Sequence, residues 1–237
     1  MRLCGWMILL SGLLGLTADH ICGQNTAAAA DEEVIFAESF AGELDREWKW
    51  LREAPSRWCI RDEGLEIRVM PGYADTVENA LIRQFPAMSG WESYAVEVTV
   101  WNPTPLRQQY EQAGLTWYVG DRPVFKLVKE LVDGEVVVVP GRKPVDGDRV
   151  QLRLEINGER FVAKYRTDKE GEFQLAGEGG IARGEDEFIS IQCYHGPPDA
   201  EHWIRFDDFR ILGLRRREQN QVSERDAAPA AFNIASF

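Results

Sequence analysis

Hydrophobic and polar residues alternate along most of the chain between residues 34 and 213. Residues 65–69 and 150–156 place an apolar side chain at every second position, which is the pattern of a strand with one buried face. Residues 94–101 and 136–139 are rich in β-branched side chains, which favour strands. No window of about 11 residues or more has apolar residues at helical spacing.

Turn-forming residues separate these strand-like runs. Asp133-Gly134 and Asn157-Gly158 each lie between two such runs and predict two-residue hairpins. Many short strands without crossover helices predict an antiparallel sandwich or barrel rather than a βαβ fold.

The two ends of the chain lack this alternation. An apolar run at residues 4–16 follows Arg2 and is shorter than the roughly 20 residues that a membrane-spanning helix needs. With the small residues 28–30 (AAA) before Asp31, it predicts a signal peptide over residues 1–30. We therefore expect a secreted or periplasmic protein with no membrane contact beyond export; the alternative is an uncleaved anchor. Residues 31–214 are predicted as one sandwich domain, and 215–237 as a disordered tail.

Length and charge narrow the class of protein. The 237 residues suit one domain. Lys and Arg number 27 against 39 Asp and Glu, a net charge of −12, which argues against nucleic acid as a partner. Beyond the predicted leader only Cys59 and Cys193 remain. Strand parity points Cys59 outward and Cys193 inward, so two unpaired thiols are expected. A disulfide is the alternative, because a one-residue register slip reverses the parity.

No self-contained catalytic motif is present. The sequence lacks a G-x-S-x-G elbow, an H-E-x-x-H helix, a P-loop and a G-x-G-x-x-G turn,. The run EDE at 185–187 follows a glycine in a turn-like stretch, not on an alternating strand. Paired carboxylates from distant positions remain open, because such pairing is spatial.

Strand parity does predict a candidate ligand-binding face. If four of the strand-like runs neighbour one another, their polar positions pave one concave face, and a histidine follows at the end of the last run, where ligands often bind. Aromatic rings suit the C–H faces of sugars, and amide and charged groups suit their hydroxyls. The alternative is a solvated face with ordinary Lys126–Glu130 and Arg153–Glu155 ion pairs. The predicted residues are Gln112, Tyr118, Lys126, Glu130, Arg153, Gln192, Tyr194 and His195.

A structural calcium site is the one candidate for a cofactor. Asp207 and Asp208 with Glu38 would supply oxygen ligands where the first and last strands pair. Hard oxygen donors of this kind suit Ca²⁺.

The order of several short motifs resembles known families. FAGEL at 40–44, WKW at 48–50, WCI at 58–60 and GLEI at 64–67 resemble the first strands of the concanavalin A-like domain that is C-terminal in glycoside hydrolase family 43 β-xylosidases. QAGL at 112–115, FK at 125–126, ELVDG at 130–134, LRL at 152–154 and FDDF at 206–209 are similar to the related "regulation of enolase" family. The hairpin at residues 165–171 of this chain (YRTDKEG) is two residues longer than the corresponding Y-S-x-D-G hairpin of that family.

This resemblance implies an all-β, jelly-roll antiparallel β-sandwich of the concanavalin A-like type and a carbohydrate context. The 237 residues hold no counterpart of the family 43 catalytic propeller, so no reaction is implied. The first hypothesis is an exported, non-catalytic module that binds carbohydrate or polysaccharide or assists its processing. The alternative is a small hydrolase or lyase that uses Glu130 with Tyr194 or His195 on the concave face. A purely structural protein is favoured if Arg153 and Glu130 pair with each other.

Overall fold

The computed structural model describes residues 31–85 and 90–215. The predicted leader and residues 216–237 of the predicted tail lie outside this range. Residue 215, assigned above to the tail, ends the last strand instead.

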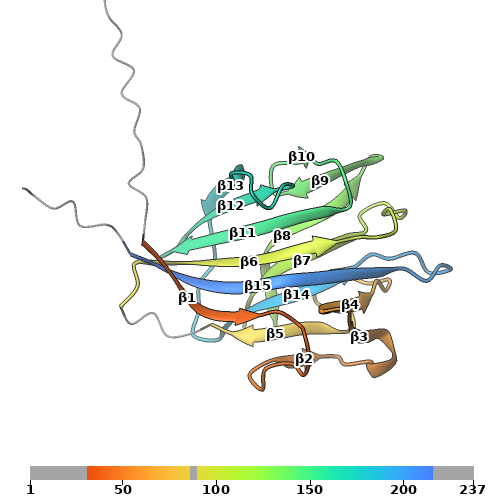
Figure 1. Cartoon of the computed structure of the whole chain (residues 1–237), viewed down its shortest axis with the longest axis horizontal. Helices are drawn as coiled ribbons and strands as arrows, with labels where there is room; N and C mark the ends of the chain where they lie inside the picture. The colour runs from red at the N-terminus through yellow and green to blue at the C-terminus, as the bar shows by residue number, and fades with distance from the viewer. Residues whose placement is uncertain (1–30, 86–89, 216–237) are drawn as a thin grey trace, which may run out of the picture.

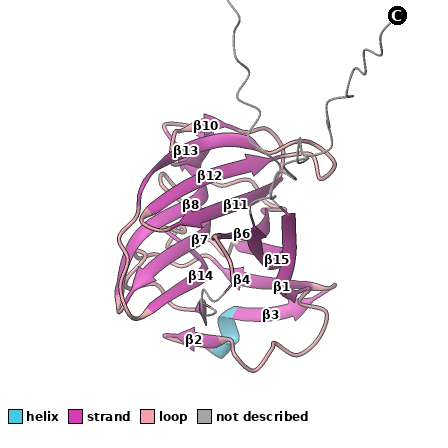
Figure 2. Ribbon diagram, turned by 90° about the vertical axis from the view of Figure 1, so that its left-hand side faces the viewer, coloured by secondary structure: helices cyan, strands magenta, loops and turns pink. Residues whose placement is uncertain are grey.

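The described residues form two antiparallel β-sheets that pack face to face (Figure 1). In spatial order the eight-stranded sheet contains β13 (Gln174–Gly180), β12 (Arg160–Arg166), β11 (Arg149–Asn157), β6 (Ser93–Trp101), β15 (Trp203–Arg215), β4 (Gly64–Arg68) and β3 (Trp58–Arg61), and β1 (Asp31–Glu38) also pairs with β15. The seven-stranded sheet contains β10 (Lys143–Pro144), β9 (Glu135–Val139), β8 (Arg122–Val132), β7 (Gln112–Val119), β14 (Glu187–Tyr194), β5 (Ala80–Gln84) and β2 (Lys49–Leu51). The one described helical segment is the 3₁₀ turn Pro55–Arg57, as Figure 2 shows.

The core lies between the two sheets and is built by the alternation read from the sequence. The eight-stranded sheet contributes Val96, Leu152 and Phe206, and the seven-stranded sheet contributes Leu115 and Ile191, all buried. Each fully buried large apolar side chain stabilises the fold by about 1.5–3 kcal/mol. The predicted inward parities of β7, β11 and β14 are therefore confirmed.

The two predicted hairpins both form, one of them with a shifted turn. Asp133 and Gly134 have φ angles of 54° and 84° and connect β8 to β9, as a type I′ turn requires. In the second hairpin Asn157 pairs with Arg160, so Gly158 and Glu159 form the loop. Asn157 therefore belongs to the strand.

Gly114 occupies a position in β7 that only glycine fits. Its φ of 154° lies in a region that side chains rarely adopt. A Cβ atom there would lie 2.4 Å from the Leu127 carbonyl oxygen and 2.8 Å from Leu152 Cδ1 of the opposite sheet. The glycine of the QAGL motif thus permits close packing across the core.

Both cysteines have the orientation that parity predicted. Cys193 is fully buried in the core, and Cys59 is half-buried with its Sγ 3.8 Å from the Glu66 carboxylate. Both thiols are free.

Candidate functional site

Most of the predicted ligand-binding residues do share one face. Strands β8, β7 and β14 are neighbours in the seven-stranded sheet. The register aligns Gln112 with Glu130 on one side and with Tyr194 on the other. On the same outer face lie Tyr118, Lys126 and Gln192.

Arg153 does not belong to this face, and its predicted placement was wrong. Its strand β11 lies between β6 and β12 in the eight-stranded sheet, across the core. There its guanidinium forms ion pairs with Glu97 at 2.5 Å, Glu32 at 2.6 Å and Glu155 at 2.7 Å. Parity specifies which side of its own sheet a residue faces, but it does not specify the sheet. Arg153 and Glu130 therefore do not pair with each other, the contact that would have favoured a purely structural role.

The middle of the face is covered by the segment between β4 and β5. The Tyr118 hydroxyl donates to the Ala74 carbonyl and lies 3.0 Å from Gln192 Oε1. Gln192 Nε2 donates to the same carbonyl at 3.5 Å. Both side chains are buried, and burial raises the pKa of the Tyr118 hydroxyl. These two predicted residues stabilise the covering segment and are closed to a ligand.

The rest of the face holds a compact polar network of Gln112, Lys126 and Glu130. Lys126 Nζ donates to Gln112 Oε1 at 2.7 Å and to Glu130 Oε2 at 2.9 Å. Gln112 Nε2 donates to the Tyr110 carbonyl at 2.8 Å and to Glu130 Oε1 at 3.4 Å. The Lys126 side chain is 34% exposed, whereas that of Glu130 is 6% exposed. Lys126 is therefore the member of the network that meets solvent.

Three aromatic residues, Tyr73, Tyr110 and His195, form a rim beside this network, which we call the tyrosine rim. The His195 ring lies edge-on to Tyr73, with centroids 4.9 Å apart, and its centroid is 6.4 Å from that of Tyr110. Tyr73 is 65% exposed and Tyr110 is 48% exposed. Tyr73 and His195 line a shallow pocket of about 190 Å³. Sequence reasoning missed both tyrosines, because they lie in segments without alternation.

Two members of the rim have an unusual backbone conformation. His195 and Tyr110 have φ angles of 59° and 68°, in the left-handed region that bulky residues rarely adopt. Such conformations cost about 1–3 kcal/mol each, and eight other non-glycine residues in the described part of the chain also have positive φ angles. Burial lowers the pKa of His195; Glu130 opposes this shift and Lys126 adds to it. The imidazole is accordingly neutral at neutral pH and has a donor and an acceptor nitrogen.

The acid–base groups of this face are constrained by their partners and surroundings. The polar network contains one carboxylate, Glu130, which is already paired with Lys126, whereas glycoside hydrolysis canonically uses two. Burial raises the pKa of Tyr194, and Glu130 and Tyr118 raise it further. A phenol with a raised pKa is a poor base near neutral pH.

The candidate calcium ligands are engaged with other groups. Strand β1 does pair with β15, but the Glu38 carboxylate accepts the backbone N–H groups of Phe40 at 3.0 Å and Asp45 at 3.1 Å. Asp208 pairs with Lys169 at 3.3 Å and Asp207 with Arg205 at 3.1 Å. Residues 31–85 and 90–215 hold no group of three or more His, Cys, Asp or Glu that could bind a metal ion. The structure therefore does not bring the predicted donors together as a site.

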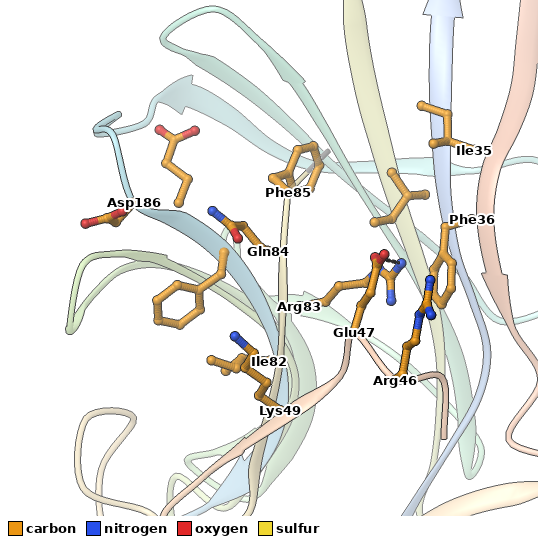
Figure 3. A pocket seen from close by; sticks show the side chains of 13 residues that line it. Ile35, Phe36, Arg46, Glu47, Lys49, Ile82, Arg83, Gln84, Phe85 and Asp186 are labelled. Carbon is orange, nitrogen blue, oxygen red and sulfur yellow. Dashed lines mark hydrogen bonds and ion pairs between the residues drawn. The ribbon is translucent and has the colours of Figure 1, made fainter. Parts of the chain in front are cut away.

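A larger pocket of about 900 Å³ lies between β1 and β5 (Figure 3). Sequence reasoning did not identify it. Arg83 crosses it, with its Cζ 3.4 Å from the centroid of the Phe36 ring, and forms ion pairs with Asp45 at 2.9 Å and Glu47 at 2.5 Å. Phe85, at the edge of residues 86–89, which the structure does not describe, also lines it.

Within the described part of the chain no helix is long and apolar enough to cross a membrane.

Comparison with known proteins supports the fold. No protein-family model matches the sequence, and no curated protein matches it significantly. Among solved structures, the GH43 protein BlXynB from Bacillus licheniformis matches with a TM-score of 0.63 and 18% identity, over 75% of this chain and 39% of that one. A xylan β-1,4-xylosidase from Bacillus halodurans matches with a TM-score of 0.56 and 18% identity, over 74% and 38%. The xyloglucan PUL GH43B protein from Bacteroides ovatus gives 0.56 and 15%, over 76% and 39%.

The chain thus spans about two fifths of the length of these structures. It has the β-sandwich fold found in proteins of glycoside hydrolase family 43. The predicted all-β sandwich and its resemblance to the sandwich domain of that family are confirmed at the level of the fold.

Proposed function

We propose that the protein is an exported, non-catalytic β-sandwich module that binds carbohydrate at the tyrosine rim. The observation that carries the proposal is the position of its exposed aromatic side chains. Among the described residues the exposed large hydrophobic side chains are Val34, Tyr73, Tyr110 and Leu175. Two of these four are the tyrosines that contact one histidine above a polar network.

The rim offers both kinds of contact that a sugar ring uses. Exposed tyrosine rings can cover the apolar C–H face of a pyranose while their hydroxyls stay in water. The Lys126 ammonium, 34% exposed, and the neutral His195 ring can bond to hydroxyl groups. The pocket of about 190 Å³ is smaller than the roughly 300–1,000 Å³ of enclosed small-molecule sites. A ligand would therefore lie across the surface, as part of a longer polysaccharide can.

The matching structures support the choice of ligands to test. One is a xylan β-1,4-xylosidase and another comes from a xyloglucan locus. Xylo-oligosaccharides and xyloglucan fragments are accordingly the first candidates, within a wider glycan array. Export rests on the apolar run at 4–16 and the small residues at 28–30. Mass spectrometry of the exported protein should find residues 1–30 removed.

The binding site can be tested with Tyr73→Ala and Tyr110→Ala. Each should weaken binding of a sugar that the wild-type protein binds by about tenfold or more, equivalent to about 1.4 kcal/mol, because each removes an aromatic face. Calorimetric titration gives the dissociation constants. The control is Leu175→Ala, since Leu175 is 52% exposed on β13 of the other sheet. Equal affinities for all four proteins would refute the site.

Analysis of the sugars after the same titration distinguishes a binding module from an enzyme. Glu130→Gln keeps the shape of the side chain and removes its charge. A binding module should keep most of its affinity, whereas an enzyme that uses Glu130 as acid or base should lose about 10²-fold or more in rate. Release of shortened sugars by the wild type, abolished in this variant, would replace the binding module with an enzyme.

A further inference from the structure

The segment that carries Tyr110 is held by a buried histidine outside the proposed site. Residues 102–111, called the 102–111 loop, connect β6 to β7. His202, which precedes β15, is 4% exposed. Its Nδ1 contacts the Glu111 carboxylate, and its Nε2 lies 2.9 Å from the Thr104 carbonyl oxygen.

Both ring nitrogens of His202 therefore face hydrogen-bond acceptors in the same loop. Only the imidazolium form carries a proton on each nitrogen, so only the cation donates to Thr104 and Glu111 together. A neutral ring has one N–H group, and one of the two acceptors then loses its donor. In a buried setting such a loss is costly.

Glu111 transmits this contact to the backbone on either side of Tyr110. The fully buried Glu111 accepts the backbone N–H groups of Arg107 at 2.7 Å and Gln108 at 3.1 Å through Oε2. The Tyr110 N–H donates to the Leu131 carbonyl at 2.8 Å, and the Leu131 N–H donates to the Glu111 carbonyl at 3.0 Å. The His202–Glu111 pair and strand β8 together fix the position of Tyr110.

The groups around the pair favour the charged histidine. Burial lowers the pKa of His202, but the hydrogen bond and charge of Glu111 and the Thr104 carbonyl raise it, so that it lies above the ordinary value; Arg107 opposes the rise. From β14, the Cys193 thiol lies near Glu111, and burial raises its pKa, so it stays neutral. Val69 directly follows β4, and its backbone N–H donates to the His202 carbonyl at 2.9 Å.

A second buried cation holds the start of the loop. Lys129 Nζ of β8 donates to Asn102 Oδ1 and, at 3.0 Å, to the Gly147 carbonyl. On the other side of His202, Glu201 accepts from Trp203 Nε1 at 2.7 Å and is turned to solvent. None of these groups replaces the two bonds of the imidazolium.

We infer that protonation of His202 holds the 102–111 loop in place and thereby regulates the proposed carbohydrate site through Tyr110. This inference rests on the proposed function for its effect on ligand, but not for the behaviour of the loop. A histidine whose folded pKa is raised contributes its stability fully below the unfolded pKa of about 6.5 and loses it as pH rises through the folded pKa. The loop is accordingly fixed below pH 6.5 and loosens as pH rises through the raised pKa of the folded protein.

Amide hydrogen exchange of the ligand-free, full-length protein tests the loop directly. Protection factors of the Arg107 and Gln108 amides, which correct for the pH dependence of intrinsic exchange, should be about ten- to a hundredfold higher near pH 5.5 than near pH 8. The midpoint of this change should match the His202 titration seen by NMR and not the Lys129 pKa of about 8. The reference is the Gly171 amide, which donates to the Asp168 carbonyl in a distant turn and should keep its protection. Equal protection of Arg107 and Gln108 at both pH values, while NMR shows His202 titrating, overturns the inference.

Two variants isolate the histidine responsible. His202→Gln should give low protection that does not change over the pH range in which NMR shows His202 of the wild type titrating. His195→Gln, at the rim, should keep the wild-type pH dependence of Arg107 and Gln108, because the His195 ring makes no hydrogen bond to the loop among the described residues. If His195→Gln removes the pH dependence of protection and His202→Gln keeps it, the pH dependence belongs to His195, and the role of His202 is refuted. If His202→Gln does not fold, the wild-type pH series with the NMR titration still decides.

The effect on binding is measured separately. For a xylo-oligosaccharide that binds, the dissociation constant should rise with pH in the wild type over the range in which loop protection falls. If none of the glycans binds at any pH, the proposed function fails, and the exchange data still decide the loop inference. A dissociation constant that stays constant while protection falls refutes regulation of the site.

Discussion

Replacing Arg153 with alanine should destabilise the fold without affecting the carbohydrate site. The Arg153 side chain is 7% exposed and pairs with Glu97, which is 6% exposed, with Glu155 and with Glu32. After the change Glu32, 45% exposed, is solvated, and Glu155 keeps Lys164 at 2.7 Å.

The cost falls on Glu97, which stays buried and loses its ion pair. Among the described residues its remaining hydrogen bond comes from Gln151 Nε2 at 3.5 Å, and Arg210, its cross-strand neighbour in β15, forms no ion pair with it. Removing one partner of a buried ion pair costs about 3–5 kcal/mol. The low end of this range applies because Glu32 is solvated and Glu155 keeps its ion pair with Lys164. Urea unfolding should show a lower midpoint with an unchanged slope.

Two further variants make the measurement decisive. Combining Arg153→Met with Glu97→Gln removes both charges and should recover a large part of the loss. Arg142→Ala breaks an exposed pair with Asp133, whose side chains are 60% and 67% exposed, and should change the free energy of unfolding by at most about 1 kcal/mol. If Arg153→Ala costs no more than Arg142→Ala, or if it alone abolishes sugar binding, the assignment of Arg153 to the framework is wrong.

Two other predictions concern the core. Burial lowers the pKa of Lys129 from 10.5 to about 8, and Asp148 opposes the shift. Between these values the unfolded chain holds a proton that the folded chain has lost. The free energy of unfolding should therefore rise with pH, by up to about 3 kcal/mol. This added stability is lost as pH falls through the folded pKa of about 8. Chemical denaturation from pH 8 to 10.5 should show this rise in the wild type relative to Lys129→Met, and parallel curves would contradict it. Gly114→Ala should prevent stable folding, because its Cβ would lie 2.4 Å from a backbone oxygen; a near-native melting temperature would show that the strand can shift.

Sequence reasoning found the fold and the faces of individual strands because both depend on local alternation. It placed Gln112, Lys126 and Glu130 together correctly, since β7 and β8 are consecutive along the chain and pair directly. It misplaced Arg153, because alternation is the same in either sheet and the order of distant strands is set by packing across the core.

Strand parity also does not predict which segments cover the outer face of a strand. Tyr118 and Gln192 face outward as predicted, yet the Ala74 carbonyl closes over them. The covering segment has no periodic pattern, and neither does the loop that carries Tyr110. The exposed tyrosines of the site come from these two segments, where composition alone does not separate a binding residue from an ordinary loop residue.

Strand β15 separates the proposed site from the two ends of the domain. Its first residue follows His202, and its last residue, Arg215, is in register with Asp31 of β1. Thirteen residues of strand extend for about 40 Å. Anything joined at residue 31 or 215 would leave the molecule at one common point far from Tyr110. Tethering the protein to a sensor surface through either end should therefore leave the rim open to even a long polymer, and inserting the whole domain into a loop of another protein should do the same.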